Sequence, residues 1–182
     1  HYNKAGLMMY TLSDFIGKEK FNKALKTFME RFRYKSSPYA DIGTFVTMVK
    51  ENTPDDLQYL VDDTFSKITL YENKAKNASA SVNEDGSYDV TFTVEAKKVY
   101  SDSTGVQTTA ELNDWLEVGI LGETIINGET TEIPILVEKV LITDSLSTFT
   151  FTVKEEPIKA GIDPMSKFID RDVDDNLIRV EL

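Results

Sequence analysis

Hydrophobic residues recur along this chain with two different periods, and the period changes near Lys67. Before that residue the apolar positions are spaced three and four apart, which is the period of an amphipathic helix. After it, apolar and polar residues alternate, as they do in a strand with one buried face. The pattern predicts an α+β protein in which residues 1–70 form about four helices and residues 71–182 form an antiparallel β-sandwich.

Four apolar stripes mark the predicted helices. Gly17 suits the left-handed turn that ends the first helix, and residues 36–38, Ser-Ser-Pro, end the second. Asp41 can cap the third helix. Thr53 and Pro54 begin the fourth, because proline fits the first helical position and the two aspartates that follow favour the helix dipole. The stripes comprise Leu7, Met8, Met9, Leu12, Phe15 and Ile16; Phe21, Leu25, Phe28, Met29 and Phe32; Ile42, Phe45, Val46 and Val49; and Leu57, Leu60, Val61 and Phe65.

Alternation marks the strands. Its clearest examples are Tyr88, Val90, Phe92, Val94 and Ala96, and then Phe149, Phe151 and Val153. The turn at residues 83–86 predicts a hairpin between an earlier strand over 68–82 and the first of these. Further strands are expected over 115–121, 133–142 and 177–182. Six or so strands with no helical pattern between them favour an antiparallel, immunoglobulin- or fibronectin-like sandwich, with Trp115 and the other aromatic residues in its core.

The charge balance and the absence of cysteine disfavour or exclude several classes of partner and chemistry. The chain has 31 acidic and 20 basic residues, a net charge of -11, which disfavours nucleic acid and anionic lipid as partners of the whole molecule. It has no cysteine, which excludes disulfides and thiolate chemistry. No apolar run approaches the roughly 20 residues that span a bilayer. Because a helical pattern starts almost at residue 1 with no methionine before it, we expect a soluble fragment of a longer polypeptide.

The number of histidines limits which catalytic sites this chain can form. A hydrolytic zinc ion needs three protein ligands, usually histidines and a carboxylate, and the only histidine is His1. The same shortage removes Ser-His-Asp and Cys-His arrangements. Carboxylates are plentiful, but no spacing singles out a glycosidase-like pair. We therefore expect no catalytic metal and no cofactor in this chain.

One acidic stretch resembles a calcium loop. Asp170, Asp172, Asp174, Asn176 and Glu181 fall on positions 1, 3, 5, 7 and 12 of such a loop. Position 6, where a sharp turn needs glycine, holds Asp175. The preferred interpretation is an Asx-rich turn that leads into the last strand, with calcium binding as the alternative.

The segment "HYNKAGLMMYTLSDFIGKEKF" resembles the part of gluzincin aminopeptidases that follows their zinc motif, in the family of alanyl aminopeptidase and leukotriene A4 hydrolase. Those proteins carry Tyr-x-Lys-Gly at the start of an apolar helix. Tyr2 and Lys4 match this pattern, while Ala5 stands where glycine is usual. The similarity continues over residues 17–71, which look like the closing helices of the catalytic domain. The tail "AGIDPMSKFIDR" is similar to bacterial relatives fused to transporter-like membrane segments.

The resemblance implies a role for Tyr2, whose equivalent donates a hydrogen bond to the oxyanion formed when zinc-bound water attacks a peptide. A phenol with a pKa near 10 stays protonated at neutral pH and can donate without carrying charge. The zinc ligands, the general base and the substrate's amino-group site are then expected upstream, in a catalytic domain of the same polypeptide. The resemblance further implies that the sandwich is a packing and spacer module and that the parent is a membrane-associated bacterial protein that cleaves peptides.

A second hypothesis needs no enzyme. A helix-plus-sandwich module could bind a protein or a carbohydrate as a free-standing unit. The two hypotheses differ in what the helices leave uncovered. Helices that belong to a larger catalytic domain expose part of an apolar face and favour self-association in isolation, whereas a free-standing module has a polar helical exterior and is a monomer.

Overall fold

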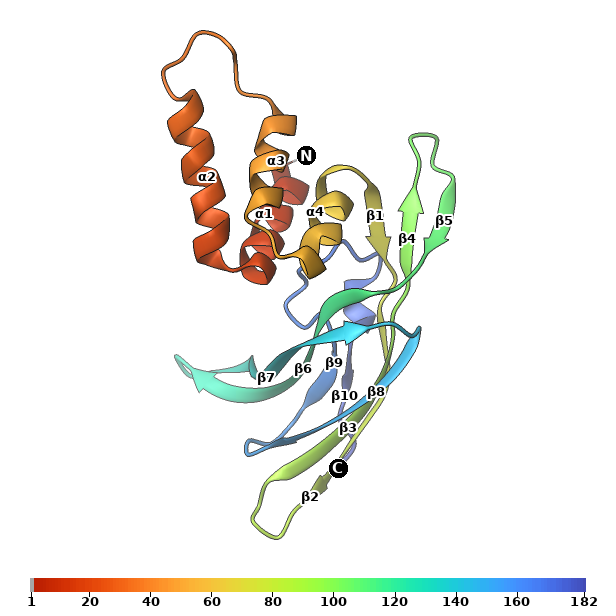
Figure 1. The fold of residues 1–182 in the computed structure, drawn as a ribbon. Coiled ribbons are helices and arrows are strands. Elements are labelled where there is room, and N and C mark those ends of the chain that lie inside the picture. Colours follow the sequence, from red (N-terminus) through yellow and green to blue (C-terminus); the bar gives the residue numbers. More distant parts are fainter. Residues whose placement is uncertain (1) are drawn as a thin grey trace. The chain divides into compact units, whose positions relative to one another are not determined.

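The computed structural model describes the backbone of residues 2–182 and the side chains from Lys4 onward. The chain divides into two compact units, described here one at a time. One contains the residues up to Thr69 together with Ser101–Val106, and the other contains Leu70–Tyr100 and Gln107–Leu182. The first unit is mainly helical and the second is built from antiparallel strands (Figure 1). The predicted α+β fold, with helices first and a β-sandwich after them, is confirmed.

Four α-helices form the first unit, as predicted. They are α1 (Tyr2–Ile16), α2 (Lys18–Phe32), α3 (Ile42–Glu51) and α4 (Gln58–Phe65). Gly17 separates α1 from α2 with a φ of 98°, a conformation that only glycine adopts at little cost. The apolar stripes meet in a core that contains Leu12, Phe15, Ile16, Phe21, Ala24, Phe45, Val49, Leu60 and Val61.

The starts of α3 and α4 differ in how well the sequence predicts them. Asp41 caps α3: its carboxylate accepts hydrogen bonds from the Thr44 hydroxyl at 2.7 Å and from the Thr44 N–H at 2.9 Å. These bonds lower the pKa of Asp41. Before α4, however, the Thr53 hydroxyl donates backward to the Val49 carbonyl at 2.7 Å. Pro54 is extended, and a 3-10 turn, η1 (Asp55–Leu57), precedes α4.

Ten strands lie in three sheets. They are β1 (Ile68–Tyr71), β2 (Lys74–Val82), β3 (Tyr88–Glu95), β4 (Lys98–Ser101), β5 (Gln107–Ala110), β6 (Asp114–Ile126), β7 (Glu129–Ile142), β8 (Leu146–Val153), β9 (Lys159–Ile162) and β10 (Leu177–Arg179). The sheet orders are β2-β3-β8, β10-β9-β6-β7 and β1-β4-β5. A short 3-10 turn, η2 (Val173–Asp175), precedes β10.

The core of the β unit lies between the first two sheets, where β9 packs against β2 and β3. Alternate residues of β3 point inward, as the sequence pattern predicts, and the long central strand β6 is buried on both faces from Leu116 to Gly122, while its end is exposed. The fully buried side chains are Val90, Phe92, Val94, Leu116, Val118, Ile120, Ala160 and Ile162. The β6–β7 hairpin turns at Asn127 and Gly128, both with positive φ, as its tight turn requires. Near the C-terminus Glu181 forms a parallel bridge with Ser79 on β2.

The predicted strand over 68–82 is in fact two strands in different sheets, β1 and β2. The break falls at Asn73, whose N–H donates to the Asp170 carboxylate and not to a neighbouring strand. The hairpin between β2 and β3 is confirmed, with its turn at residues 83–86. Sequence patterning misses β4, β5 and β9, because strands of four residues are too short to show an alternation. Trp115, on β6, is half-buried.

Candidate functional site

Tyr2 is the first helical residue of α1, and its side chain lies outside the described residues, as does His1. Its oxyanion-stabilising role therefore stays a prediction. Within the described part of the chain, no group of three or more His, Cys, Asp and Glu side chains lies close enough together to hold a metal ion. These residues do not fit a zinc site, and no zinc chemistry is assigned to them.

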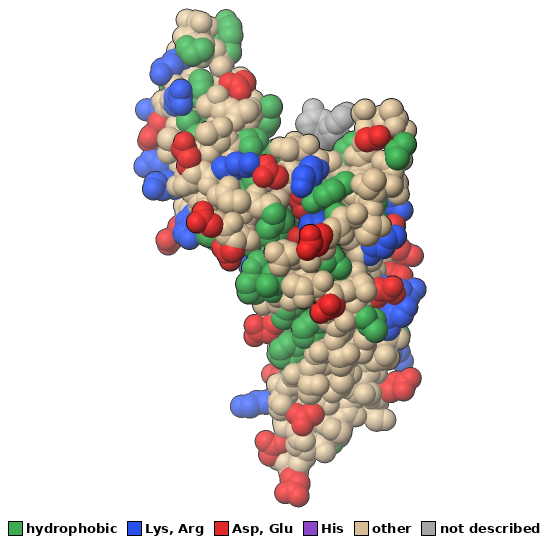
Figure 2. Space-filling model, turned by 45° about the vertical axis from the view of Figure 1, so that its right-hand side comes forward, with side chains coloured by type: hydrophobic (Ala, Val, Ile, Leu, Met, Phe, Trp, Pro, Cys, Tyr) green, Lys and Arg blue, Asp and Glu red, His purple; other side chains and the backbone are tan. Residues whose placement is uncertain are grey.

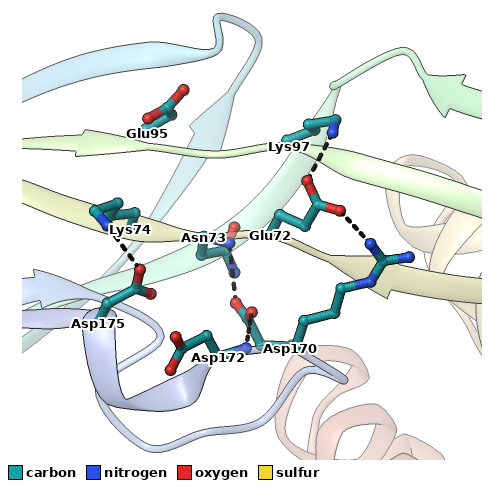
Figure 3. A pocket seen from close by; sticks show the side chains of 9 residues that line it. Glu72, Asn73, Lys74, Glu95, Lys97, Asp170, Asp172 and Asp175 are labelled. Atoms are coloured by element: carbon teal, nitrogen blue, oxygen red, sulfur yellow. Dashed lines mark hydrogen bonds and ion pairs between the residues drawn. The ribbon is translucent and has the colours of Figure 1, made fainter.

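The β unit contains a polar pocket of about 200 Å³ (Figure 3). It lies where the break between β1 and β2 meets the acidic stretch that precedes β10. Its walls carry more carboxylates than basic groups. The lining residues are Glu72, Asn73, Lys74, Glu95, Lys97, Asp170, Arg171, Asp172 and Asp175.

Ion pairs occupy much of the pocket wall. The Glu72 carboxylate accepts hydrogen bonds from Lys97 Nζ at 2.6 Å and from Arg171 at 2.7 Å. The hydrogen bond from Lys97, with the positive charges of both partners, lowers the pKa of Glu72. Lys74 Nζ lies 3.0 Å from Asp175, and this hydrogen bond raises the pKa of Lys74. All of these charges are partly exposed, so water and salt weaken the pairs.

Asp170 organises the backbone beside the pocket. Its carboxylate accepts hydrogen bonds from the N–H groups of Asn73 at 3.0 Å and Asp172 at 3.1 Å, and the second closes an Asx turn. The amide of Asn176, oriented to satisfy its surroundings, donates to the Asn73 carbonyl at 3.1 Å and to Asp170 at 3.3 Å. Burial raises the pKa of Asp170. The predicted Asx-rich turn is confirmed.

The residues that match the calcium loop by spacing do not cluster as a metal site within the described part of the chain. Asp170 directs its oxygens at N–H groups, as described above, and the fifth candidate ligand residue, Glu181, pairs with Ser79 on β2. The residues that match the loop by spacing therefore serve two different parts of the fold.

Asn73 is the least satisfied polar residue in this region. Its side chain is 2% exposed, and neither its amide nitrogen nor its amide oxygen has a hydrogen-bond partner among the described residues. Both atoms are closed off from solvent, so a molecule in the pocket would reach them only if the wall moved. The arrangement is that of an ionic network that joins the β1–β2 break to the acidic stretch.

The β unit also buries charges that the sequence analysis did not predict. Lys98 pairs with Asp114 at 2.7 Å, and Lys167 pairs with Glu117; all four side chains are buried. The sequence marks these buried pairs only through Glu117, which is a charged residue inside the apolar run "WLEVGIL". A charged residue in such a run must be buried with a partner. The sequence alone does not say which residue that partner is.

Asp163 lies next to the second pair. Its carboxylate accepts hydrogen bonds from the N–H groups of Lys167 at 2.8 Å and Phe168 at 3.0 Å. Burial outweighs these bonds and raises the pKa of Asp163 to about 6, and the negative charge of Glu117 adds to the rise. The group is almost fully enclosed, so we assign it a role in stability and not in binding.

The helical unit carries an apolar groove of about 400 Å³. It is bounded by α1, α2 and the start of α3, and its one charged lining residue is Asp41. Met29 is 59% exposed and Ile42 is 65% exposed, both high for large apolar side chains. The groove is lined by Met9, Leu25, Phe28, Met29, Ala40, Asp41, Ile42 and Phe45.

Comparison with known proteins adds no assignment: no protein-family model matches the chain, and no curated protein matches it. Over the part that the structure describes, none of the helices is both long enough and apolar enough to cross a membrane.

Proposed function

We propose that this chain is the C-terminal part of a zinc aminopeptidase-like protein of the gluzincin type and is not catalytic alone. Its helices complete the helical end of a catalytic domain, and its β unit is a structural module. The catalytic domain, upstream in the same polypeptide, holds the zinc ion and binds the peptide substrate. The support comes from the Tyr-x-Lys resemblance at Tyr2 and Lys4 and from the apolar groove of the helical unit.

The groove is the observation that carries the proposal. Three helices contribute apolar side chains to it, and the aromatic rings of Phe28 and Phe45 pack edge to face with centroids 5.3 Å apart. The wall is therefore preformed. Met29 and Ile42 stand exposed beside it, although water is an unfavourable environment for them. A contiguous apolar surface of this kind marks an interface.

Self-association of the isolated chain tests whether this groove forms an interface with another apolar surface. We expect light scattering after size exclusion to show association that rises with protein concentration. Replacing Met29→Lys and Ile42→Lys should abolish it, because charged side chains resist burial in an apolar interface. The matched control is Thr27→Lys with Thr47→Lys, two exposed positions outside the groove on the same helices. Equal behaviour of the two double variants would count against the groove.

The complete polypeptide tests the enzymatic half of the proposal. We expect it to contain one zinc ion per chain and to release N-terminal residues from peptides. In that protein Tyr2→Phe should lower turnover by about a hundred- to a thousandfold, the usual effect of losing one oxyanion donor, with the zinc content unchanged. Turnover near that of the wild type would refute the role of Tyr2.

The interaction module is the competing outcome. A complete polypeptide with no zinc motif upstream, no bound zinc and no peptidase activity would leave the groove as the binding surface of a non-enzymatic module. The fold and the groove would stand, and the peptidase assignment would fall.

A further inference from the structure

The charge of α2 and the residues that follow it is opposite in sign to that of the whole chain. Residues 18–35 contain seven Lys and Arg against two Glu, a local net charge of +5 in a chain of -11. All seven basic side chains are exposed: Lys18, Lys20, Lys23, Lys26, Arg31, Arg33 and Lys35. Figure 2 shows several Lys and Arg side chains on the helical unit, with Asp and Glu side chains among them. The seven basic side chains produce a local positive potential.

The loop between α2 and α3 adds two exposed tyrosines to this basic region. Tyr34 is 100% exposed and Tyr39 is 77% exposed. Tyr34 has a φ of 60°, a left-handed conformation that is uncommon for a bulky residue. Backbone preference therefore does not explain a tyrosine at this position. Residues 33–40 include no acidic residue, and the loop extends beyond the ends of both helices (Figure 1).

We propose that the exposed side of α2, together with the tyrosine-bearing loop that follows it, binds the surface of an anionic lipid membrane. Lysine and arginine near such a surface are attracted to its headgroups. Tyrosine favours the headgroup region, because its ring is apolar and its hydroxyl group is polar. The exposed side of α2 lies over the headgroups, and Tyr34 and Tyr39 enter the interface.

The shape of the loop favours a lipid surface over a folded acidic protein. Tyr34 and Tyr39 do not line the apolar groove, and both are exposed residues of the loop between α2 and α3, which extends beyond the ends of the two helices (Figure 1). A protein partner would need a cavity that matches this loop, because protein interfaces are closely packed at their centre. A fluid layer of headgroups adapts to it without one.

The overall negative charge does not prevent this binding. Interactions between exposed charges are screened beyond about 8 Å at physiological ionic strength. The basic side of α2 therefore acts on a nearby surface mainly through its own charges. This surface is distinct from the groove, so the inference does not rest on the peptidase assignment.

Vesicle sedimentation with the purified chain tests the proposal. The probes are vesicles of phosphatidylcholine alone and of phosphatidylcholine mixed with phosphatidylserine. We expect binding to the mixed vesicles that weakens as salt is raised, and much weaker binding to phosphatidylcholine. Absence of binding to the mixed vesicles at physiological ionic strength would overturn the proposal, and so would equal binding to both compositions.

Paired variants locate the surface. Lys20→Gln with Lys23→Gln should weaken binding to the mixed vesicles tenfold or more, because each basic residue near such a surface contributes about fivefold. Tyr34→Ser with Tyr39→Ser should weaken binding to both kinds of vesicle. The matched control, Lys154→Gln with Arg179→Gln, removes two exposed charges from the β unit and should bind as the wild type does.

Two results would place the surface elsewhere or give it another partner. Equal weakening by the control pair would show that the attraction is not specific to α2. Binding to an acidic polypeptide such as polyglutamate, with none to vesicles, would assign the basic surface to a protein partner and overturn the lipid proposal. All these positions are exposed, so the variants are expected to melt as the wild type does, which circular dichroism checks.

Discussion

Lys167 and Glu117 form an ion pair inside the β unit, with 6% and 3% of their side chains exposed. The two residues are 50 positions apart in the sequence, so the pair joins the loop after β9 to the central strand β6. Removing two charges from water is costly, and their attraction compensates only while both partners are present. The pair therefore makes the position of that loop depend on β6.

Lys167→Met should destabilise the protein by about 3–5 kcal/mol, because it leaves Glu117 charged and buried without its partner. Urea unfolding followed by circular dichroism measures the loss. The double variant Lys167→Met with Glu117→Leu should recover most of it, since an apolar pair of similar volume often replaces a buried ion pair without loss. A double variant no more stable than the single one would contradict this interpretation.

The titration of Asp163 should make the protein less stable as the pH rises from about 4 to 7. The pKa of Asp163 is raised from 3.8 to about 6, so the folded chain binds this proton more tightly than the unfolded chain does. Between these two pKa values Asp163 ionises in the unfolded chain but keeps its proton in the folded chain, which lowers the free energy of unfolding by about 3 kcal/mol. Asp163→Asn should remove that contribution. Parallel stability curves for wild type and variant across this pH range would show that Asp163 does not titrate as proposed.

Gly161 allows two backbones to approach closely within the sheet. A Cβ atom at this position would lie 2.0 Å from the Asn176 carbonyl oxygen, so Gly161→Ala must push β9 and the residues before β10 apart. We expect a loss of about 1–3 kcal/mol, typical of overpacking. Gly6→Ala is the control, because Gly6 is in α1 with open space around it and should gain about 0.5–1 kcal/mol. Thermal melting of both variants makes the comparison, and a tolerated Gly161→Ala would show that the strands can separate.

Asn73 and Asn176 should respond oppositely to truncation although both are buried. Asn73 has two side-chain atoms without partners, so Asn73→Ala removes unsatisfied groups and should leave the free energy of unfolding unchanged or raised. Asn176 donates to a backbone carbonyl and to Asp170, so Asn176→Ala should cost about 1–3 kcal/mol. Chemical denaturation of the two variants side by side measures the difference. A clear loss in Asn73→Ala would mean that its amide has a partner in solution.

Local patterns predicted the parts of this fold that depend on local physics. The helical stripes, the cap at Asp41, the break at Gly17 and the alternation in β3 each follow from residues close together in the sequence. The buried pairs do not, because nothing near Glu117 identifies Lys167 as its partner. The end of β1 at Asn73 depends in the same way on Asp170, which lies 97 residues further along the chain.

The exposed surfaces of the helical unit could not be predicted from the sequence either. Periodicity assigned Met29 and Ile42 to apolar stripes but did not say which part of each stripe is covered, and the two side chains stand exposed beside the groove. The local charge of α2 was hidden by the net charge of the chain, which is acidic. Averages over the whole sequence describe solubility and not individual surfaces.

The most direct test of the central claim, that the groove is covered by an upstream catalytic domain, is thiol alkylation at Met29→Cys. The chain has no cysteine of its own, so in the isolated chain the label reports this one position, and in the complete polypeptide it is followed on the proteolytic peptide that contains residue 29. At concentrations low enough to keep the isolated chain monomeric, the account predicts fast alkylation in the isolated chain and at least tenfold slower alkylation in the complete polypeptide. Thr27→Cys, an exposed position on the same helix outside the groove, should react fast in both. Equally fast alkylation of Met29→Cys in both proteins would contradict the claim.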